Sequence, residues 1–216
     1  MKIPQKDLPH ILVSITGPGF SKTDVCKMVT ALRAFPLGGF VVEPCCLEIC
    51  HSCVQPAYIP LIGQVNYPLG LSTTDCACEA IRWCFDQGAD QVLIGVPGGF
   101  LRSGAQEEMR QYLSRAAAVN PKRPLRVAIN AEVLTDDELN LVGDLIPSSG
   151  VSSLHVFLDS NLDALARRVA FLKKMVRAGI PVGVDEIRDP SLIATIRSLG
   201  ADFVTVSDPV QLLSSL

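Results

Sequence analysis

Several residues with acid–base or ligand chemistry fall at the ends of predicted strands. His155 alternates with Phe157 and Asp159, so these three side chains share one face of a strand. A histidine there could act as a general base or a ligand, and the other interpretation is a hydrogen-bonded histidine in the core. Asp185 and Glu186 end a later strand and are also catalytic candidates.

Four more polar residues end neighbouring strands and are candidates for binding a substrate. They are Asn130, Glu132, Arg188 and Ser207. With the histidine and carboxylates above, Asn130 and Glu132 have the oxygen and nitrogen donors of a divalent-metal site. The same residues would also form a hydrated acidic rim, and we predict that no metal binds there. Arg188 could bind an anion or pair with the nearby acids.

The cysteines allow several interpretations. All eight lie in the N-terminal half, and in a chain of this length without a secretory signal reduced thiols are favoured over disulfides. Cys46, Cys50 and Cys53 have the spacing of the iron–sulfur loop in radical-SAM enzymes, but this spacing is also one face of a helix. Cys50 and Cys53 could instead be a redox pair. A zinc site could use Cys45, Cys76 or Cys78. We predict no cofactor.

The elements that position these residues alternate between short apolar strands and helices. Helix starts are marked by Ser21 and by the capping box Thr135-Asp136-Asp137-Glu138, and a long helix is predicted over 162–178. The strands are predicted at 11–16, 39–44, 59–65, 91–96, 125–130, 154–159, 181–187 and 203–207. This alternation favours a single (β/α)8 TIM-barrel domain over residues 1–216, with its site at the carboxyl ends of the strands.

Composition narrows the functional classes. Hydrophobic residues make up 48% of the 216 residues, which is enough for a sizeable core. A net charge of −3 gives no reason to expect binding to nucleic acid or to a membrane surface. The N-terminus has no signal-peptide pattern, and no apolar run is long enough to cross a bilayer. We therefore expect a cytoplasmic protein with a small-molecule ligand, which could form a homo-oligomer.

The stretch from Gln64 to Gly104 carries a family resemblance. It contains Tyr67-Pro68-Leu69-Gly70 followed by Thr73-Thr74, then Gly88-Ala89-Asp90, and ends in Arg102-Ser103-Gly104. This series resembles, without a gap, the motifs of the deoxyribose-phosphate aldolase family. The resemblance implies a TIM barrel. It also implies a Schiff-base lysine on strand six, a helper lysine on strand seven and an aspartate on strand four.

The residues that would carry this chemistry differ here. The family's aspartate corresponds to Leu93, its Schiff-base lysine falls on or next to His155, and its helper lysine falls on Val182. None of the lysines lies on a predicted strand, and imidazole cannot replace an amine that forms an imine. The family's phosphate-binding Gly-Gly pair is replaced by Asp185-Glu186, whose carboxylates would repel a phosphate dianion.

These departures predict a non-catalytic homologue with a binding or regulatory role. Two alternatives keep an enzymatic activity. One is a lyase acting on a different, non-phosphorylated carbonyl compound through His155 and the acidic barrel mouth. The other is cleavage of deoxyribose 5-phosphate, the family's own reaction, by residues other than those aligned here.

Overall fold

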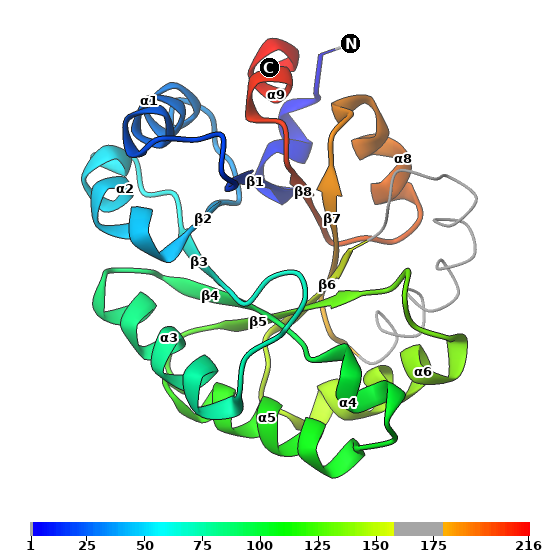
Figure 1. Ribbon diagram of the computed structural model, residues 1–216. Coiled ribbons are helices and arrows are strands. Elements are labelled where there is room, and N and C mark those ends of the chain that lie inside the picture. The colour runs from blue at the N-terminus through cyan, green and yellow to red at the C-terminus, as the bar shows by residue number, and fades with distance from the viewer. Residues whose placement is uncertain (1, 158–178) are drawn as a thin grey trace.

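The computed structural model describes residues 2–157 and 179–216 (Figure 1). In these ranges, parallel strands close into a barrel in sequence order, and β8 pairs with β1. The strands are β1 (Ile11–Ile15), β2 (Gly39–Val42), β3 (Leu61–Val65), β4 (Gln91–Gly95), β5 (Leu125–Asn130), β6 (Ser153–Phe157), β7 (Val182–Ile187) and β8 (Phe203–Val206). The predicted (β/α)8 barrel is confirmed.

Helices surround the barrel (Figure 1). The α-helices are α1 (Lys22–Leu32), α2 (Leu47–Val54), α3 (Thr74–Asp86), α4 (Gly98–Arg102), α5 (Gln106–Ala118), α6 (Asp136–Leu145), α8 (Ile193–Ser198) and α9 (Pro209–Ser215). The 3-10 helices are η1 (Gln5–His10), η2 (Pro44–Cys46), η3 (Ile146–Ser148) and η4 (Pro190–Leu192). Capping boxes at Ser21 and Thr135 begin α1 and α6, as the sequence predicts. Asp159 and the helix predicted over 162–178 lie outside the described residues.

Alternation along the strands separates two layers of side chains. A large outer cluster packs between the strands and the helices. A smaller inner cluster fills part of the barrel axis and contains Leu12, Val41, Ile62, Leu93, Ala128 and Phe203, with Tyr67 packed against it. The apolar inner cluster is concentrated on β1 to β4, so the inner side of β5 to β8 is where polar side chains gather.

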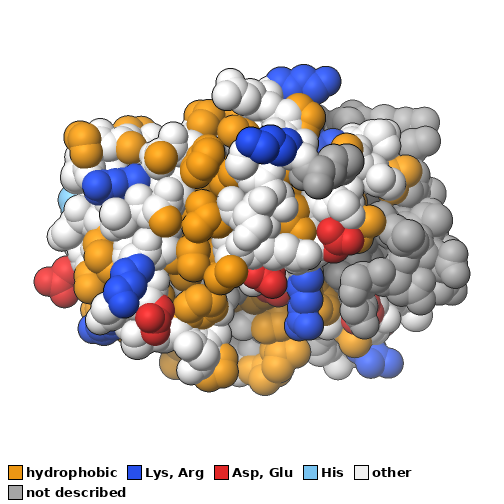
Figure 2. All heavy atoms as spheres, turned by 90° about the horizontal axis from the view of Figure 1, so that it is seen from above, with side chains coloured by type: hydrophobic (Ala, Val, Ile, Leu, Met, Phe, Trp, Pro, Cys, Tyr) orange, Lys and Arg blue, Asp and Glu red, His pale blue; other side chains and the backbone are white. Residues whose placement is uncertain are grey.

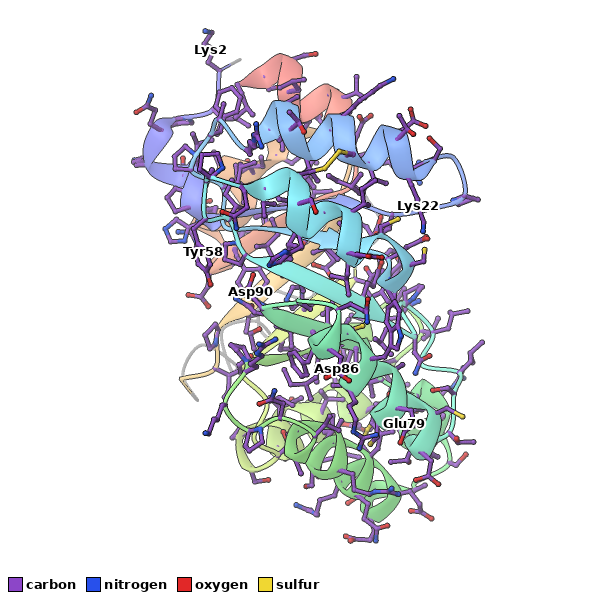
Figure 3. All side chains as sticks on the ribbon, turned by 90° about the vertical axis from the view of Figure 1, so that its left-hand side faces the viewer. Lys2, Lys22, Tyr58, Glu79, Asp86 and Asp90 are labelled. Carbon is purple, nitrogen blue, oxygen red and sulfur yellow. A yellow bond between two sulfur atoms is a disulfide. The ribbon has the colours of Figure 1, made fainter. Side chains whose placement is uncertain are left out.

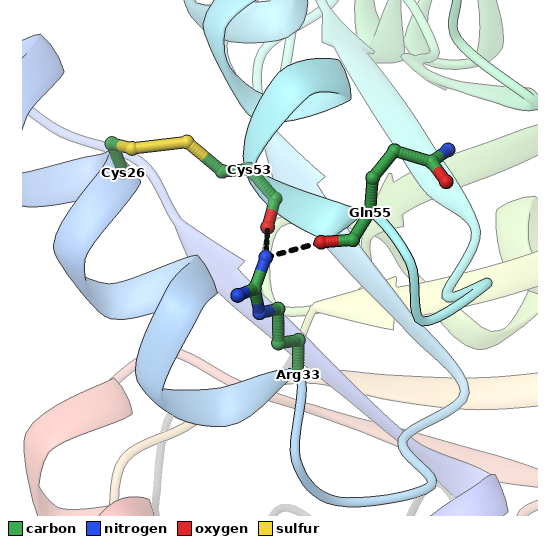
Figure 4. The surroundings of a disulfide bond; sticks show 4 residues. All are labelled: Cys26, Arg33, Cys53 and Gln55. Atoms are coloured by element: carbon green, nitrogen blue, oxygen red, sulfur yellow. Dashed lines mark hydrogen bonds between the residues drawn. A yellow bond between two sulfur atoms is a disulfide. The ribbon is translucent and has the colours of Figure 1, made fainter.

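A disulfide links α1 to α2, which corrects the expectation of reduced thiols for two of the cysteines. Cys26 and Cys53 are joined, with their Cα atoms 5.9 Å apart (Figure 4). Arg33 donates a hydrogen bond from Nη1 to the carbonyl of Cys53 at 2.6 Å and another to the carbonyl of Gln55. The sequence did not reveal this pairing because the contact depends on how α1 and α2 pack side by side.

One face of the molecule presents apolar side chains to solvent. Figure 2 shows them as a band across the face that carries α1 and α9. On α9, Val210 is 59% exposed and Leu213 is 36% exposed. No helix among the described residues is both long and apolar enough to span a membrane.

Candidate functional site

A chain of polar side chains runs along the barrel interior from β5 to β8. Arg126 donates from Nε to Gln91 at the start of β4. Its Nη1 lies 3.3 Å from His155 Nε2. On the other side of the imidazole, His155 Nδ1 lies 2.8 Å from Asp185 Oδ1. His155 is fully buried, and Asp185 is 1% exposed. The imidazole therefore bridges a buried guanidinium and a buried carboxylate.

The hydrogen-bond partners determine the tautomer of His155. A guanidinium can only donate, so Nε2 accepts from Arg126, and Nδ1 carries the proton that is donated to Asp185. Burial lowers the pKa of His155, although Asp185 opposes the shift, so the ring is neutral at pH 7. Burial also lowers the pKa of Arg126 to about 10, which still leaves it charged.

These contacts limit what His155 can do. Both ring nitrogens are engaged, and the side chain has no exposed surface. The Phe203 ring covers it at a centroid distance of 4.5 Å, and the Arg126 guanidinium lies over the same ring at 5.0 Å. This geometry favours the interpretation of His155 as a hydrogen-bonded core histidine, which holds Asp185 in place rather than touching a ligand.

Asp185 presents an unused oxygen at the upper end of this chain of contacts. Its Oδ1 accepts from His155 and, at 2.5 Å, from the Thr205 hydroxyl. Its Oδ2 is buried and has no hydrogen-bond partner, and the same is true of the Tyr67 and Ser207 hydroxyl oxygens. Tyr67 lies beside both Asp185 and Glu186, and Ser207 lies beside Glu186, without a well-formed hydrogen bond between them. Buried polar atoms without partners are uncommon, so this cluster is the candidate site of the barrel.

Glu186 reaches this site through an unusual backbone conformation. Its φ is +63°, in the left-handed region that side chains with a Cβ rarely adopt. The register between β7 and β8 shifts between Val184 and Ile187, so the strand bulges at this residue. Burial raises the pKa of the Glu186 carboxyl, and the charge of Asp185 raises it further. Such strain is found mainly where it serves a function.

Asp185 and Glu186 thus form a pair of carboxyl groups with different environments. Asp185 is compensated by Arg126 through His155 and accepts two hydrogen bonds. Glu186 is repelled by Asp185 and is attracted by Arg188, whose side chain is exposed. Opposite environments of this kind separate the acid and base roles of two carboxyl groups.

The other sequence-predicted residues occupy different places. Leu93 lies inside the barrel, where the family's strand-four residue is expected. Val182 lies in the outer cluster, so it does not reach the interior. The inward position beside it is Gly183, where a Cβ would collide with the Phe203 ring. Asn130 ends β5 and accepts a hydrogen bond from the Glu132 backbone at 3.0 Å, while the Glu132 side chain is exposed.

The lysines of the described ranges lie away from the strands. Lys22 is an exposed residue at the start of α1, and Figure 3 shows it at the opposite end of the barrel from Tyr58 and Asp90. The others are Lys2, Lys6, Lys27 and Lys122, all in helices or connecting segments. In the part of the chain that the structure describes, the barrel interior therefore contains a guanidinium but no amine.

A small apolar pocket opens at the carboxyl ends of other strands of the barrel. Its volume is about 90 Å³, and it lies between the segments that follow β3, β4 and β5. Pro68 lines it directly after Tyr67, and Asn130 is its polar residue. The remaining lining residues are Leu69, Val96, Gly98, Leu101, Ile129, Val133 and Leu134. Leu69 and Val133 are more than half exposed at its rim.

The metal and cluster hypotheses gain no support from the described residues. Among them, no group of three or more His, Cys, Asp or Glu side chains could hold a metal ion. Cys53 is bonded to Cys26, so its thiol is not free for the predicted iron–sulfur loop or for the predicted Cys50–Cys53 redox pair. Cys45 lies near Cys46 instead, with 3.9 Å between their sulfur atoms.

Three residues of the site were not found from the sequence. Arg126 interrupts an otherwise apolar strand at an inward position, and this break in the pattern is a signal that could have found it. Tyr67 stands where the family motif has phenylalanine, so its hydroxyl is an addition in this chain. Thr205 carried no sequence signal, because threonine is common in buried strands.

Comparison with known proteins gives partial sequence matches and a shared fold. No family model matches the chain. Deoxyribose-phosphate aldolase of Haloarcula marismortui is 31% identical over 113 residues, which is 48% of this chain and 48% of that protein. The chain thus spans about half the length of this relative. Deoxyribose-phosphate aldolase 1 of Staphylococcus aureus (strain MSSA476) is 21% identical over 98% of this chain and 96% of its own length.

A solved structure extends the likeness to the whole barrel. The deoxyribose phosphate aldolase from Aeropyrum pernix, described as a tetramer, superposes with a TM-score of 0.82 at 18% identity, covering 99% of this chain and 92% of its own. At that identity the likeness shows the fold. The motif between Gln64 and Gly104, the sequence matches and the common barrel together identify the chain as a divergent member of the deoxyribose-phosphate aldolase family.

Proposed function

We propose that this protein is a non-catalytic member of its family that binds a small molecule at the carboxyl end of the barrel. The observation that carries the proposal is the replacement of interior amines by the Arg126–His155–Asp185 chain of contacts. A guanidinium does not form an imine with a carbonyl compound, and the neutral His155 is enclosed. The barrel would hold its ligand by hydrogen bonds and charge, without covalent capture.

The acidic mouth also disfavours the phosphorylated substrate of the aldolases. Asp185 and Glu186 stand where the family has its phosphate-binding glycine pair. A carboxylate and a phosphate charge about 4 Å apart repel each other by about 4 kcal/mol at an effective dielectric of 20. Arg188 is exposed, and its single positive charge lies near a site with two carboxyl groups. We expect deoxyribose 5-phosphate to bind weakly.

Reductive trapping tests this proposal. The protein is incubated with deoxyribose 5-phosphate and sodium borohydride, and its intact mass is measured. The Staphylococcus aureus aldolase is the positive control. We expect no added mass on this protein, whereas an adduct mapped to any of its lysines would overturn the proposal.

A second candidate function follows from Glu186 and Tyr67. A carboxyl group with a raised pKa beside an unpaired hydroxyl could remove a proton next to the carbonyl of a non-phosphorylated substrate. The test is deuterium incorporation from D2O into dihydroxyacetone and 2-deoxyribose, followed by NMR. Exchange that exceeds the buffer rate and disappears in Glu186→Gln would favour this function, and exchange equal to the buffer rate would exclude it for these substrates.

We also propose that the chain forms a homo-oligomer through the apolar face of α9. The exposed Val210 and Leu213 support this, as does the tetramer described for the Aeropyrum pernix protein. Light scattering after size exclusion should give a mass above 23.2 kDa, and Val210→Asp should reduce it. A monomeric mass for the unmodified protein would reject this proposal.

A further inference from the structure

The pocket between the segments that follow β3, β4 and β5 is a concave site at the carboxyl end of the barrel. All of its lining residues are uncharged, and Asn130 is the polar one among them. Small-molecule sites are mostly apolar, with a few polar groups that orient the ligand. A charged group would lose its hydration here without gaining a counter-charge. The lining therefore favours a neutral small molecule.

Asn130 determines which polar group such a molecule needs. Its Oδ1 accepts a hydrogen bond from the Glu132 backbone N–H at 3.0 Å. Because a backbone N–H can only donate, this contact identifies the oxygen of the amide and leaves Nδ2 as a donor. In the part of the chain that the structure describes, Nδ2 has no hydrogen-bond partner. A ligand in this pocket should therefore carry a hydrogen-bond acceptor.

The pocket volume limits the size of the apolar group. The volume is about 90 Å³. An engineered apolar cavity of about 150 Å³ binds benzene, so at the same packing about four heavy atoms fit here. Leu69 and Val133, which are 56% and 51% exposed at the rim, extend the apolar walls. A ring or branched group of about five heavy atoms would thus be mostly enclosed.

We propose that this pocket binds a small neutral molecule with a compact apolar group and one hydrogen-bond acceptor, such as an ether oxygen. The apolar group lies against Pro68, Leu101 and Ile129, and the acceptor receives a hydrogen bond from Asn130 Nδ2. Ligand contact with Leu69 and Val133 removes apolar surface from water and adds to the affinity. The inference goes beyond the proposed function, because it assigns a ligand class to a site that the carboxyl groups of β7 do not form.

Three five-membered rings separate the features of this proposal. Tetrahydrofuran is a neutral acceptor, cyclopentane has neither acceptor nor charge, and pyrrolidine at pH 7 is a cation that only donates. Each ring is titrated into the full 15N-labelled chain, and amide signals are followed by NMR. We expect tetrahydrofuran to shift the Gly98 and Leu101 signals saturably, cyclopentane to bind about fivefold more weakly, and pyrrolidine not to bind. Equal affinity for the three rings, or no saturable shift with tetrahydrofuran, would overturn the proposal.

Asn130→Asp tests the hydrogen-bond donor. The variant keeps an oxygen for the Glu132 backbone and replaces Nδ2 with a second carboxylate oxygen. Tetrahydrofuran affinity should fall at least about fivefold, and pyrrolidine should become the preferred ring. An order of affinities that stays the same as in the unmodified protein would reject Asn130 as the group that orients the ligand.

Two adjacent glycines test the location. Gly98 lines the pocket and Gly99 does not. A Cβ at either position meets no atom within 4 Å, and neither glycine has a positive φ. Gly98→Val should fill part of the pocket and weaken tetrahydrofuran and cyclopentane at least about tenfold, whereas Gly99→Val should leave both affinities unchanged. Thermal melting checks that both variants fold. No loss in Gly98→Val, or an equal loss in the two variants, would overturn the assignment to this pocket.

This experiment and the trapping experiment fail independently. A borohydride adduct with deoxyribose 5-phosphate would overturn the non-catalytic function, whatever tetrahydrofuran does. Failure of tetrahydrofuran to bind would overturn the pocket ligand and leave the non-catalytic function standing.

Discussion

Substitutions at Glu186 test whether its backbone conformation and buried carboxyl group lower the stability of the folded protein. Its left-handed backbone conformation costs a residue with a Cβ about 1–2 kcal/mol, and glycine avoids this cost. Glycine also destabilises the folded protein by about 0.5–1 kcal/mol, because it gives the unfolded chain more conformational freedom. Glu186→Gly should therefore be more stable than Glu186→Ala by about 1 kcal/mol, which corresponds to about 2–4 °C for a domain of this size.

The alanine variant separates backbone strain from the buried carboxyl group. Both variants remove the carboxyl, but only glycine removes the Cβ. The folded-state pKa of Glu186 is raised above 4.5, so the folded protein binds more protons between that value and the raised pKa. The resulting destabilisation is absent below pH 4.5 and grows as the pH rises through the raised pKa. Each variant should therefore gain more over the unmodified protein at pH 8 than at pH 4.

Urea denaturation at pH 4 and pH 8 measures both effects. The difference between the glycine and alanine variants should be the same at the two pH values, because neither residue titrates. A glycine variant no more stable than the alanine variant would show that residue 186 is not held in a left-handed conformation. A gain that is the same at pH 4 and pH 8 would show that the carboxyl group is not destabilised by burial.

Three further predictions concern the barrel interior and the disulfide. Gly183→Ala places a Cβ against the Phe203 ring and should cost about 1–3 kcal/mol in urea denaturation, part of which Phe203→Leu should restore. The folded-state pKa of His155 is lowered, so the free energy of unfolding should fall as the pH drops below 6.5, by at most about 1.4 kcal/mol per pH unit. The variant His155→Gln should show a smaller dependence of stability on pH. Without reductant, thiol titration in guanidinium should find six thiols, and eight after reduction, with Cys26 and Cys53 as the added pair; eight at the outset would disprove the disulfide.

Much of the barrel could be predicted because its signals are local. Each strand is a short apolar run, and helix starts such as Ser21 and Thr135 use side-chain caps that the sequence displays. The short helix α4 was not predicted, because it begins with two glycines after Pro97 and reads as a loop. Local signals fail where a segment forms a helix only because the surrounding barrel holds it.

The site was less predictable because it depends on contacts between strands. His155 and Asp185 were both chosen as candidates, but their hydrogen bond and the Arg126 beneath them require the register of β5, β6 and β7. Val182 differs from an inward position by one residue, and in a strand one residue exchanges the two faces. Neither the composition nor the hydrophobic periodicity of the sequence indicates the bulge at Glu186.

The interior contacts explain why the substitutions in this chain belong together. A buried carboxylate such as Asp185 needs a counter-charge and hydrogen-bond donors; Arg126 supplies the charge through His155, and His155 and Thr205 donate to its Oδ1. An amine introduced beside Asp185 would be held protonated by that carboxylate, whereas imine formation requires the neutral amine. In the non-catalytic function that we propose, the Asp185 carboxylate would thus oppose imine formation by any amine placed beside it.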